Sequence, residues 1–260
     1  MNILEEIIAY KRKEVAQQEY DTPVWLLEQK PGYAREPISL RSRLATTGSP
    51  GIIAEFKRRS PSMGIINDAV ELNAVVAAYQ EFGASAVSVL TDEHFFGGSL
   101  YDLEAARDLA LPLLRKDFII NEYQLIQSKA WGADIILLIA ACLSVEEVKY
   151  LAQAAKKLGL EVLLEIHTAD ELGHINNAVD FVGINNRNLK DFKVDLEHSI
   201  SLAQKIPEGF IKIAESGINE VATIHALRKH GFRGFLMGEV FMKEKDPGKA
   251  FQNFMSSLLA

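Results

Sequence analysis

The hydrophobic residues of this chain follow two spacings, which alternate regularly from residue 52 onward. Short continuous apolar runs are typical of buried strands, whereas apolar residues three or four positions apart are typical of helices that cover a core. The runs that predict strands are residues 52–56, 86–90, 112–114, 134–139, 161–166, 181–184, 211–214 and 234–237.

A segment with helical spacing follows each predicted strand. These segments are residues 70–82, 100–109, 122–131, 145–158, 169–175, 196–205, 221–230 and 247–258. Glycine recurs where a helix gives way to a strand, at Gly83, Gly132, Gly159 and Gly231. Glycine accepts the left-handed conformation that often ends a helix. This alternation predicts parallel strands in a sheet that is covered on both faces.

A parallel sheet of eight strand–helix units either closes into a barrel or stays open as a doubly wound sheet. No Gly-x-Gly-x-x-Gly sequence follows the first predicted strand, which disfavours an open sheet that binds a dinucleotide. The length of 260 residues suits one α/β barrel, a fold that typically has ~250 residues. We therefore predict that residues 1–260 form a single (β/α)8 TIM barrel domain.

The first 50 residues contain no convincing strand and predict short helices instead. Apolar residues on one side of the segment before Asp21 predict a first helix, and two shorter helices are predicted at residues 25–29 and 40–45. We therefore expect residues 1–50 to form a helical N-terminal extension that packs over the larger unit.

The composition limits the classes of partner. Lysine and arginine total 28 against 35 aspartate and glutamate residues, for a formal charge of −7. We therefore expect neither nucleic acid nor an anionic membrane as partner, although a local pocket can still bind a small anion. The start of the chain carries Glu5 and Glu6 and no long apolar run, so we expect neither a signal peptide nor a membrane anchor.

The one cysteine, Cys142, lies in an apolar run, which favours a small buried side chain over a nucleophile. A single cysteine cannot form a disulfide within the chain, as expected of a protein in the reducing cytoplasm. The sequence has no His-x-His, no cysteine pair and no acid–histidine spacing typical of a metal site, so we expect no metal and no cofactor. Among the histidines, His94 and His167 lie near predicted strand ends.

Polar residues follow most of the predicted strands. In a barrel the carboxyl ends of the strands share one rim, where the active site lies. Glu55 and Lys57 end the first strand on the same side, two residues apart. The candidates after the other strands are Thr91, Asp92, Arg115, Lys116, Asp117, Glu165, Asn185, Asn186, Arg187, Glu215 and Glu239. We expect two lysines, an arginine and several acids to converge on this rim, with a surface ion pair as the alternative for Glu55 and Lys57.

Glu165 differs from the other acids because it lies inside an apolar run, between Leu164 and Ile166. A carboxyl group in such surroundings is expected to be partly buried and to have a raised pKa. A raised pKa suits a group that transfers protons near neutral pH. We therefore expect Glu165 to act in acid–base catalysis.

The last two strands indicate a phosphate site. Ser216, Gly217 and Gly238 precede predicted helix starts after these strands. Glycine lets the backbone approach a ligand closely, and the N–H groups at a helix start face an anion. Barrels often bind phosphate in this position, although the glycines could also serve only to permit tight turns. The residues thus predict a substrate with a phosphate at one end and lysines and carboxylates acting at the other.

Several blocks of the sequence occur in the same order in a known family. They are IAEFKRRSPS at 53–62, LTD at 90–92, FFGGS at 95–99, LRKDFI at 114–119, LLE at 163–165, GINNRNL at 183–189 and AESGI at 214–218. Through them, and through its N-terminal extension, the chain resembles the indole-3-glycerol-phosphate synthase family of tryptophan biosynthesis over nearly its whole length. Two positions depart from the family. Arg59 is expected to point away from the site, and Glu239 can offer a phosphate only its backbone N–H, so its side chain must turn aside.

The resemblance implies a cytoplasmic carboxy-lyase that closes an indole ring. Its substrate would be 1-(2-carboxyphenylamino)-1-deoxyribulose 5-phosphate, and its products indole-3-glycerol phosphate, carbon dioxide and water. A ring carbon attacks the ketone, the carboxylate leaves, and dehydration restores aromaticity. The resemblance also implies that the N-terminal segment partly covers the mouth of the site.

The resemblance implies roles for individual residues. Lys116 would protonate the developing alkoxide, and Glu165 would take or return protons. Lys57 would hold the anthranilate carboxylate or act as a second acid, with Glu55 oriented against it. The other implied substrate contacts are Asn185 and Arg187 at the reacting centre, Ser60, Pro61 and Phe118 around the aromatic ring, and Glu215, Ser216, Gly217, Gly238 and Glu239 at or near the phosphate.

Two other interpretations remain at this level. One is another phosphate-binding barrel, such as a sugar-phosphate isomerase or the tryptophan synthase α subunit. The other is a non-catalytic barrel that binds a phosphorylated ligand. We expect a small phosphorylated molecule as the substrate, and we expect the chain to act as a monomer or weak homodimer.

Overall fold

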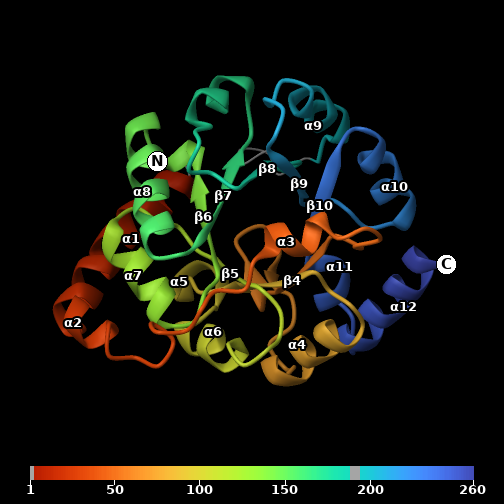
Figure 1. The fold of residues 1–260 in the computed structure, drawn as a ribbon. Coiled ribbons are helices and arrows are strands. Elements are labelled where there is room, and N and C mark those ends of the chain that lie inside the picture. The colour runs from red at the N-terminus through yellow and green to blue at the C-terminus, as the bar shows by residue number, and fades with distance from the viewer. Residues whose placement is uncertain (1–2, 188–193) are drawn as a thin grey trace.

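A computed structural model of the chain describes residues 3–187 and 194–260. Within these residues, eight parallel strands close into a barrel in the order β1-β10-β9-β8-β7-β6-β5-β4 (Figure 1). The strands are β1 (Ile52–Phe56), β4 (Ala86–Leu90), β5 (Leu113–Lys116), β6 (Ile135–Ile139), β7 (Glu161–Ile166), β8 (Phe181–Asn185), β9 (Ile211–Glu215) and β10 (Phe232–Met237). The prediction of a (β/α)8 TIM barrel is confirmed.

Helices surround the barrel and bury its outer face. They are α4 (Leu72–Glu81), α6 (Leu100–Ala106), α7 (Glu122–Ala130), α8 (Val145–Lys157), α9 (Leu196–Ala203), α10 (Val221–Lys229) and α12 (Pro247–Leu259). The segment predicted as a helix after β7 is a 3-10 helix, η2 (Ala169–His174). Four short elements have no counterpart in the sequence prediction: the β2 (Arg59–Ser60) and β3 (Gly64–Ile65) hairpin, α5 (Glu93–Phe96), η1 (Ala140–Cys142) and α11 (Glu239–Met242).

Helix α8 illustrates why these segments fold as predicted. Ser144 and Glu147 form a reciprocal capping box at its start, which satisfies backbone N–H groups that have no partner within the helix. Val148, Leu151 and Ala155 recur at helical spacing and are buried against the barrel. Full burial of one leucine side chain stabilises a fold by roughly 1.5–3 kcal/mol, so such a stripe determines which face of the helix packs inward.

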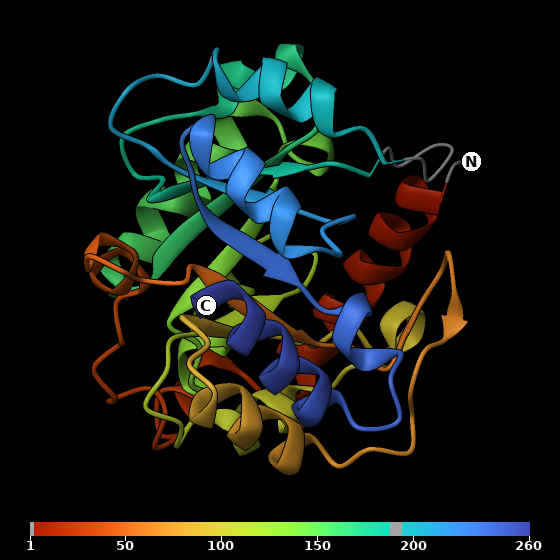
Figure 2. The ribbon, with the colours of Figure 1, turned by 90° about the vertical axis from the view of Figure 1, so that its right-hand side faces the viewer.

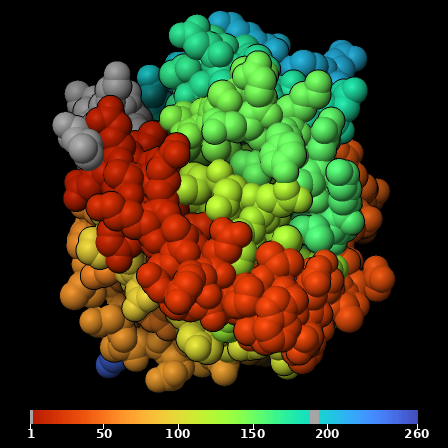
Figure 3. Space-filling model, turned by 90° about the vertical axis from the view of Figure 1, so that its left-hand side faces the viewer, coloured from red at the N-terminus to blue at the C-terminus, as the bar shows by residue number. Residues whose placement is uncertain are grey.

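The N-terminal extension divides between the two ends of the barrel. Helix α1 (Ile3–Asp21) and the short α2 (Val24–Leu27) precede a loop that leads to α3 (Leu40–Ala45). Figure 2 shows α1 beside the carboxyl ends of the strands and α3 on the opposite side of the barrel. Figure 3 shows the extension lying across one face of the molecule between these positions.

We expected the N-terminal extension to cover the mouth of the site, but its helix α3 lies at the other end of the barrel and does not contribute to the mouth. Leu40 and Leu44 lie on one face of α3, four residues apart, and join the apolar cluster inside the barrel. Glu161, at the start of β7, accepts a hydrogen bond from the backbone N–H of Leu40 at 2.8 Å. The helix thus closes the amino end of the barrel because it fills the interior with leucine and anchors its first turn on a buried acid.

The alternation of side chains along each strand determines what reaches the rim. Ile53, Leu114, Leu163 and Ile213 belong to the apolar cluster inside the barrel. Side chains two positions further along a strand point to the same side. Each of these four strands therefore ends with an inward-facing polar residue: Glu55, Lys116, Glu165 and Glu215.

No helix among residues 3–187 and 194–260 is long and apolar enough to cross a membrane.

Candidate active site

A cavity of about 380 Å³ opens at the carboxyl ends of the barrel strands. This volume is within the usual range for small-molecule sites. Its lining includes every residue that the sequence analysis proposed as catalytic or substrate-binding: Glu55, Lys57, Ser60, Pro61, Lys116, Phe118, Glu165, Asn185, Arg187, Glu215, Ser216, Gly217, Gly238 and Glu239. The structure therefore brings these residues, which come from six of the barrel strands or the loops after them, into one site.

Lys116 is the central cation of the cavity. Its Nζ lies 3.1 Å from Glu165 Oε2 and 2.8 Å from Glu215 Oε2, and all three side chains are largely buried. Burial alone would lower the pKa of Lys116, but the charges of Glu165, Glu215 and Glu55 outweigh it and raise the pKa. Lys116 therefore carries its proton into the cavity.

Glu165 is held as an anion. Besides Lys116, it accepts a hydrogen bond from Asn185 Nδ2 at 3.1 Å, and His167 Nε2 lies 3.2 Å from its Oε1. Burial alone would raise the pKa of Glu165, but Lys116, His167 and Asn185 together lower it. Our expectation of a raised pKa was therefore wrong, because the donors that surround Glu165 come from other strands and from the loop after β7.

Glu215 is the carboxyl group with the raised pKa. Burial and the neighbouring charge of Glu165 raise the pKa of Glu215 to about 7, against the opposing effect of Lys116. Its Oε1 is buried and has no hydrogen-bond partner among the described residues. A Cβ atom at Gly183 would lie only 2.2 Å from this oxygen, so glycine at that position makes room for the carboxyl group.

Two further ion pairs border the cavity. Lys57 Nζ lies 2.9 Å from Glu55 Oε1, so this pair lies within the cavity and not on the open surface. Arg187 Nη2 lies 2.9 Å from Glu239 Oε2, and the Glu239 carboxylate turns toward this arginine. Both pairs place a cation and an acid where a ligand can separate them.

The turn after β9 has unusual backbone geometry. Ser216 has a φ of 66°, the one positive φ at a residue other than glycine in the described chain, and Gly217 follows with a φ of 70°. A left-handed serine is strained. The side chain of Asn186 supports the turn by donating a hydrogen bond to the Ser216 carbonyl at 2.6 Å.

Of the two arginines among the rim candidates, Arg187 lines the cavity and Arg115 does not reach it. Its side chain is 2 % exposed and points outward from the barrel toward α7, because it alternates with the inward-facing Lys116. Its guanidinium pairs with Asp117 at 2.9 Å. Asp117 in turn lies 3.0 Å from Nζ of Lys11, a buried lysine of α1.

The same Lys11 also lies 2.7 Å from Asp92 Oδ2. It thus connects α1 to the loops after β4 and β5. Nothing in the sequence pattern distinguishes Lys11 from Lys13, which is exposed; only the contacts of Lys11 do so. Arg59 points away from the cavity, as expected, and donates a hydrogen bond to the Glu93 carbonyl at 2.8 Å.

The apolar side chains that line the site were not predicted from the sequence. They include Ile3, Leu4 and Ile7 of α1, Phe96 of α5, and Leu137 and Ile139 of β6. The rings of Phe96 and Phe118 lie 6.1 Å apart between centroids. Apolar residues at a strand end show the same sequence pattern as core residues, so the sequence does not distinguish the two. Only Phe96 offered a signal, because it directly precedes Gly97 and Gly98.

Comparison with known proteins identifies the family. Residues 4–254 match the family model described as indole-3-glycerol phosphate synthase. A relative of that name from Bacteroides thetaiotaomicron is 50% identical over 258 residues, which cover 99% of both chains. Another from Salinibacter ruber is 41% identical over 254 residues, which cover 96% of this chain and 94% of the relative.

The chain belongs to the indole-3-glycerol phosphate synthase family. It therefore has the activity of this family in tryptophan biosynthesis, and the two alternatives left by the sequence analysis are not supported.

The solved structures that resemble the chain show its fold alone. The tryptophan synthase α subunit from Legionella pneumophila has a TM-score of 0.62 at 15% identity and covers 85% of this chain and 95% of its own. A 3-hexulose-6-phosphate synthase from Salmonella typhimurium has a TM-score of 0.62 at 14% identity, covering 80% of this chain and 98% of its own. These similarities agree with a closed barrel.

Proposed function

We propose that the side chains around Lys116 carry out each step of indole-ring closure. The substrate is 1-(2-carboxyphenylamino)-1-deoxyribulose 5-phosphate, and the products are indole-3-glycerol phosphate, carbon dioxide and water. The observation that supports this assignment best is a buried, protonated lysine between two carboxylates, which lies inside a cavity bordered by apolar and aromatic side chains.

Lys116 serves as the general acid. The ring carbon that carries the carboxylate attacks the ketone carbon, and the electron pair of the carbonyl bond moves to oxygen. A proton from Lys116 turns the developing alkoxide into a hydroxyl group, so no full negative charge builds up in the cavity. The bond to the carboxylate then breaks, carbon dioxide leaves, and its electron pair returns to the ring.

Glu165 and Glu215 act on either side of Lys116 during dehydration. Loss of the hydroxyl group as water needs a proton on the departing oxygen and a base for the proton of the carbon next to nitrogen. Glu165, held ionised, suits the base. Glu215, whose pKa of about 7 lies near neutrality, suits a group that donates a proton and is refilled from solvent.

Lys57 and Glu55 prepare the reacting end of the substrate. In the free enzyme Lys57 pairs with Glu55, and an anthranilate carboxylate can take the place of Glu55. Asn185 and Arg187 line the opposite side and contact the ribulose hydroxyls. Ser60, Pro61 and Phe118 flank the aromatic ring together with Phe96, which adds a second aromatic side chain to that wall.

The phosphate binds at the end of the cavity lined by Ser216, Gly217 and Gly238. The strained turn at Ser216 supports this placement, since such strain is concentrated at functional positions. A side chain at Gly238 would collide with Glu55, so glycine at this position lets the turn pack closely against the end of β1. Glu239 offers its backbone N–H, while its carboxylate pairs with Arg187 and so turns aside from the anion.

Helix α1 partly covers the mouth of the site, because Ile3, Leu4 and Ile7 form part of the cavity lining. Excluding water there strengthens the interactions of the charged groups with the substrate. The cavity is built from one chain, so a monomer or weak homodimer suffices for activity. The single cysteine agrees with a cytoplasmic location.

The test of this assignment is Lys116→Met with the carboxyphenylamino-deoxyribulose phosphate as substrate. We expect turnover, measured as carbon dioxide release and indole-glycerol-phosphate fluorescence, to fall on the order of 10³-fold or more, because the developing alkoxide loses its general acid. Circular dichroism should show an intact fold. Lys149→Met, which alters an exposed lysine of α8, is the matched control. A near-normal kcat in Lys116→Met would overturn the assignment.

A further inference from the structure

His167 follows the last residue of β7 and lies behind Glu165, outside the cavity lining. Its side chain is 10 % exposed. The ring lies between two carboxylates: Nε2 is 3.2 Å from Glu165 Oε1, and Nδ1 is 3.8 Å from Glu171 Oε2. These are ion-pair distances, and neither nitrogen makes a well-directed hydrogen bond within the described chain.

This arrangement determines the protonation state of the ring. A neutral imidazole has one nitrogen with a proton and one with a lone pair. In either tautomer the lone pair would face a carboxylate, either Glu165 or Glu171, at a distance too short for a water molecule to lie between them. Only the imidazolium presents a proton to both acids. The ring of His167 is therefore a buried cation.

The position of Glu171 is fixed independently of the ring. Its Oε2 accepts hydrogen bonds from the backbone N–H groups of His167 and Thr168, and the bond from Thr168 is part of the capping box of η2. Burial alone would lower the pKa of His167, but Glu165 and Glu171 outweigh it and raise the pKa to about 10. The cation therefore persists through neutral pH.

Other groups near this ring do not change the conclusion. From α9, His198 donates its Nε2 proton to the backbone carbonyl of His167 at 2.9 Å and does not contact the ring nitrogens. From η1, Cys142 lies near both acids, and burial together with their charges raises the pKa of its thiol to about 12, so it remains neutral. Lys116 and Glu215 lie beyond Glu165, on the side of the cavity.

Glu165 thus has two cations within ion-pair distance in the described chain, Lys116 and His167. In the proposed mechanism Lys116 gives its proton to the substrate, which removes one of these charges from Glu165. His167 cannot make such a transfer, because it lies outside the cavity lining. Its charge on Glu165 therefore stays constant through the reaction.

We propose that His167 is a positioning residue for the indole-ring closure: its imidazolium holds the Glu165 carboxylate ionised and oriented while Lys116 acts on the substrate. The inference rests on the proposed role of Glu165. It extends the active site beyond the residues that touch the cavity, and it assigns a function to a histidine that the sequence placed only near the rim.

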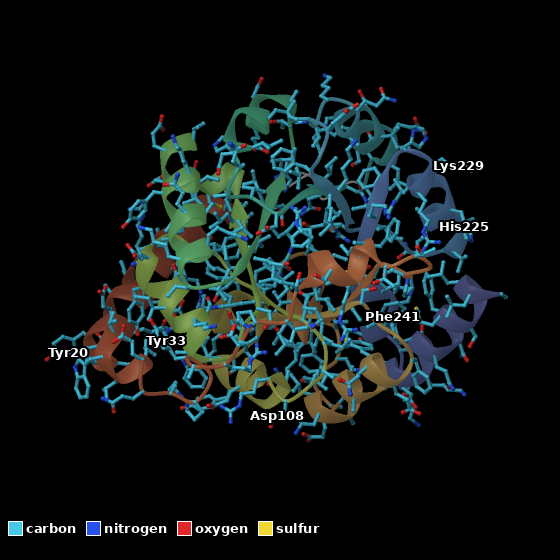
Figure 4. All side chains as sticks on the ribbon, in the orientation of Figure 1. Tyr20, Tyr33, Asp108, His225, Lys229 and Phe241 are labelled. Carbon is cyan, nitrogen blue, oxygen red and sulfur yellow. The ribbon has the colours of Figure 1, made fainter. Side chains whose placement is uncertain are left out.

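The pH profile of kcat tests this role. We compare the wild type with His167→Gln, which removes the charge, His167→Lys, which keeps a cation, and His225→Gln as matched control. His225 is exposed on α10, on the outer surface of the molecule (Figure 4). In His167→Gln we expect the acid limb of the profile to move up by about one pH unit, since loss of a neighbouring positive charge raises the pKa of a carboxyl group. His167→Lys should restore much of the wild-type profile, and His225→Gln should match it.

Two results would overturn the proposal. One is a folded His167→Gln variant with an unchanged pH profile, whatever its KM. The other comes from nuclear magnetic resonance of the wild type, where the His167 ring signals, assigned by their loss in His167→Gln, should be those of an imidazolium at pH 7.5. Signals of a neutral ring at that pH would contradict the inferred imidazolium, whatever the pH profiles of the variants.

The variant Glu165→Gln, measured beside these variants, distinguishes an error in the role of Glu165 from an error in the role of His167. If Glu165→Gln has normal turnover, the assigned role of Glu165 is wrong. If Glu165→Gln is impaired and His167→Gln keeps the wild-type profile, the mechanism stands and the role of His167 is refuted.

Discussion

The two ends of the barrel both bury carboxylates, but they provide different partners. At the amino end, Asp134 accepts hydrogen bonds from the backbone N–H groups of Ile38 and Leu113 and also pairs with the Arg35 side chain. Glu161 accepts hydrogen bonds from the backbone N–H of Leu40 and from the Ser39 hydroxyl. At the carboxyl end, Glu165 and Glu215 interact with the side chains of Lys116, Asn185 and His167.

This difference separates stability from chemistry. A backbone donor cannot move away without disrupting the strand or helix that contains it, so the acids at the amino end connect the extension to the strands permanently. A side-chain donor can rotate toward a ligand. The acids at the carboxyl end can therefore exchange partners when a substrate enters, in agreement with the general placement of barrel active sites at that end.

The cluster around Lys11 is an exception, because it is structural but lies near the carboxyl end. Lys11→Met leaves Asp92 and Asp117 buried without this cation. We expect the free energy of unfolding to fall by ~3–5 kcal/mol, the usual cost of breaking a buried ion pair by removing one partner. Chemical denaturation measures it, with the exposed Lys13→Met as control. Equal stability of both variants would show that this cluster is not structural.

Glu165→Gln tests the carboxyl end directly. We expect kcat to fall at least roughly a hundredfold, the usual scale for an acid–base group, or about 2.7 kcal/mol in activation free energy. The free energy of unfolding should not decrease, because the partners of Glu165 are side chains that can rearrange. Steady-state kinetics with the phosphorylated substrate measures the first effect. A Glu165→Gln variant that loses stability but keeps its kcat would show that Glu165 stabilises the fold and does not act in catalysis.

Asp134→Asn is the corresponding change at the amino end. The amide nitrogen would face a backbone N–H in place of an acceptor, so we expect a loss of about 1–3 kcal/mol in the free energy of unfolding. The kcat should remain that of the wild type. Asp108→Asn, at an exposed aspartate on the outside of the barrel (Figure 4), is the control. A large fall in kcat without destabilisation would contradict the division into a stabilising end and a catalytic end.

His167 also makes the stability of the fold depend on pH. The pKa of His167 is raised in the folded state, to about 10 from an ordinary value of 6.5, so the folded protein binds this proton more tightly than the unfolded chain. The stabilisation is complete below pH 6.5 and is lost as the pH rises toward 10. Denaturation of wild type and His167→Gln should therefore give a stability difference that shrinks across this range. A constant difference would mean that the ring stabilises the fold through packing alone.

The sequence predicted much of this site because the barrel imposes a simple rule. Lys116, Glu165 and Glu215 each follow an inward-facing apolar residue by two positions, so alternation alone carries them to the rim. The same rule correctly applied would have placed Arg115 on the outer face. It could not identify Lys11, whose partners Asp92 and Asp117 lie far away in the sequence. Nor could it identify His167, because the fold of the chain after β7 decides that its ring lies between Glu165 and Glu171.

The order of strands and helices was determined by the sequence itself, because hydrophobic spacing follows directly from the period of each element. The ionisation of the active-site groups was decided only by the tertiary structure. The contacts of Lys116 with Glu165 and Glu215 join residues 49 and 99 positions apart. A pKa depends on charges and donors within a few ångströms, and the closure of the barrel decides which ones these are. For this reason the pKa of Glu165 is lowered, although its apolar neighbours in the sequence predicted a raised pKa. The pKa of Glu215 is raised instead.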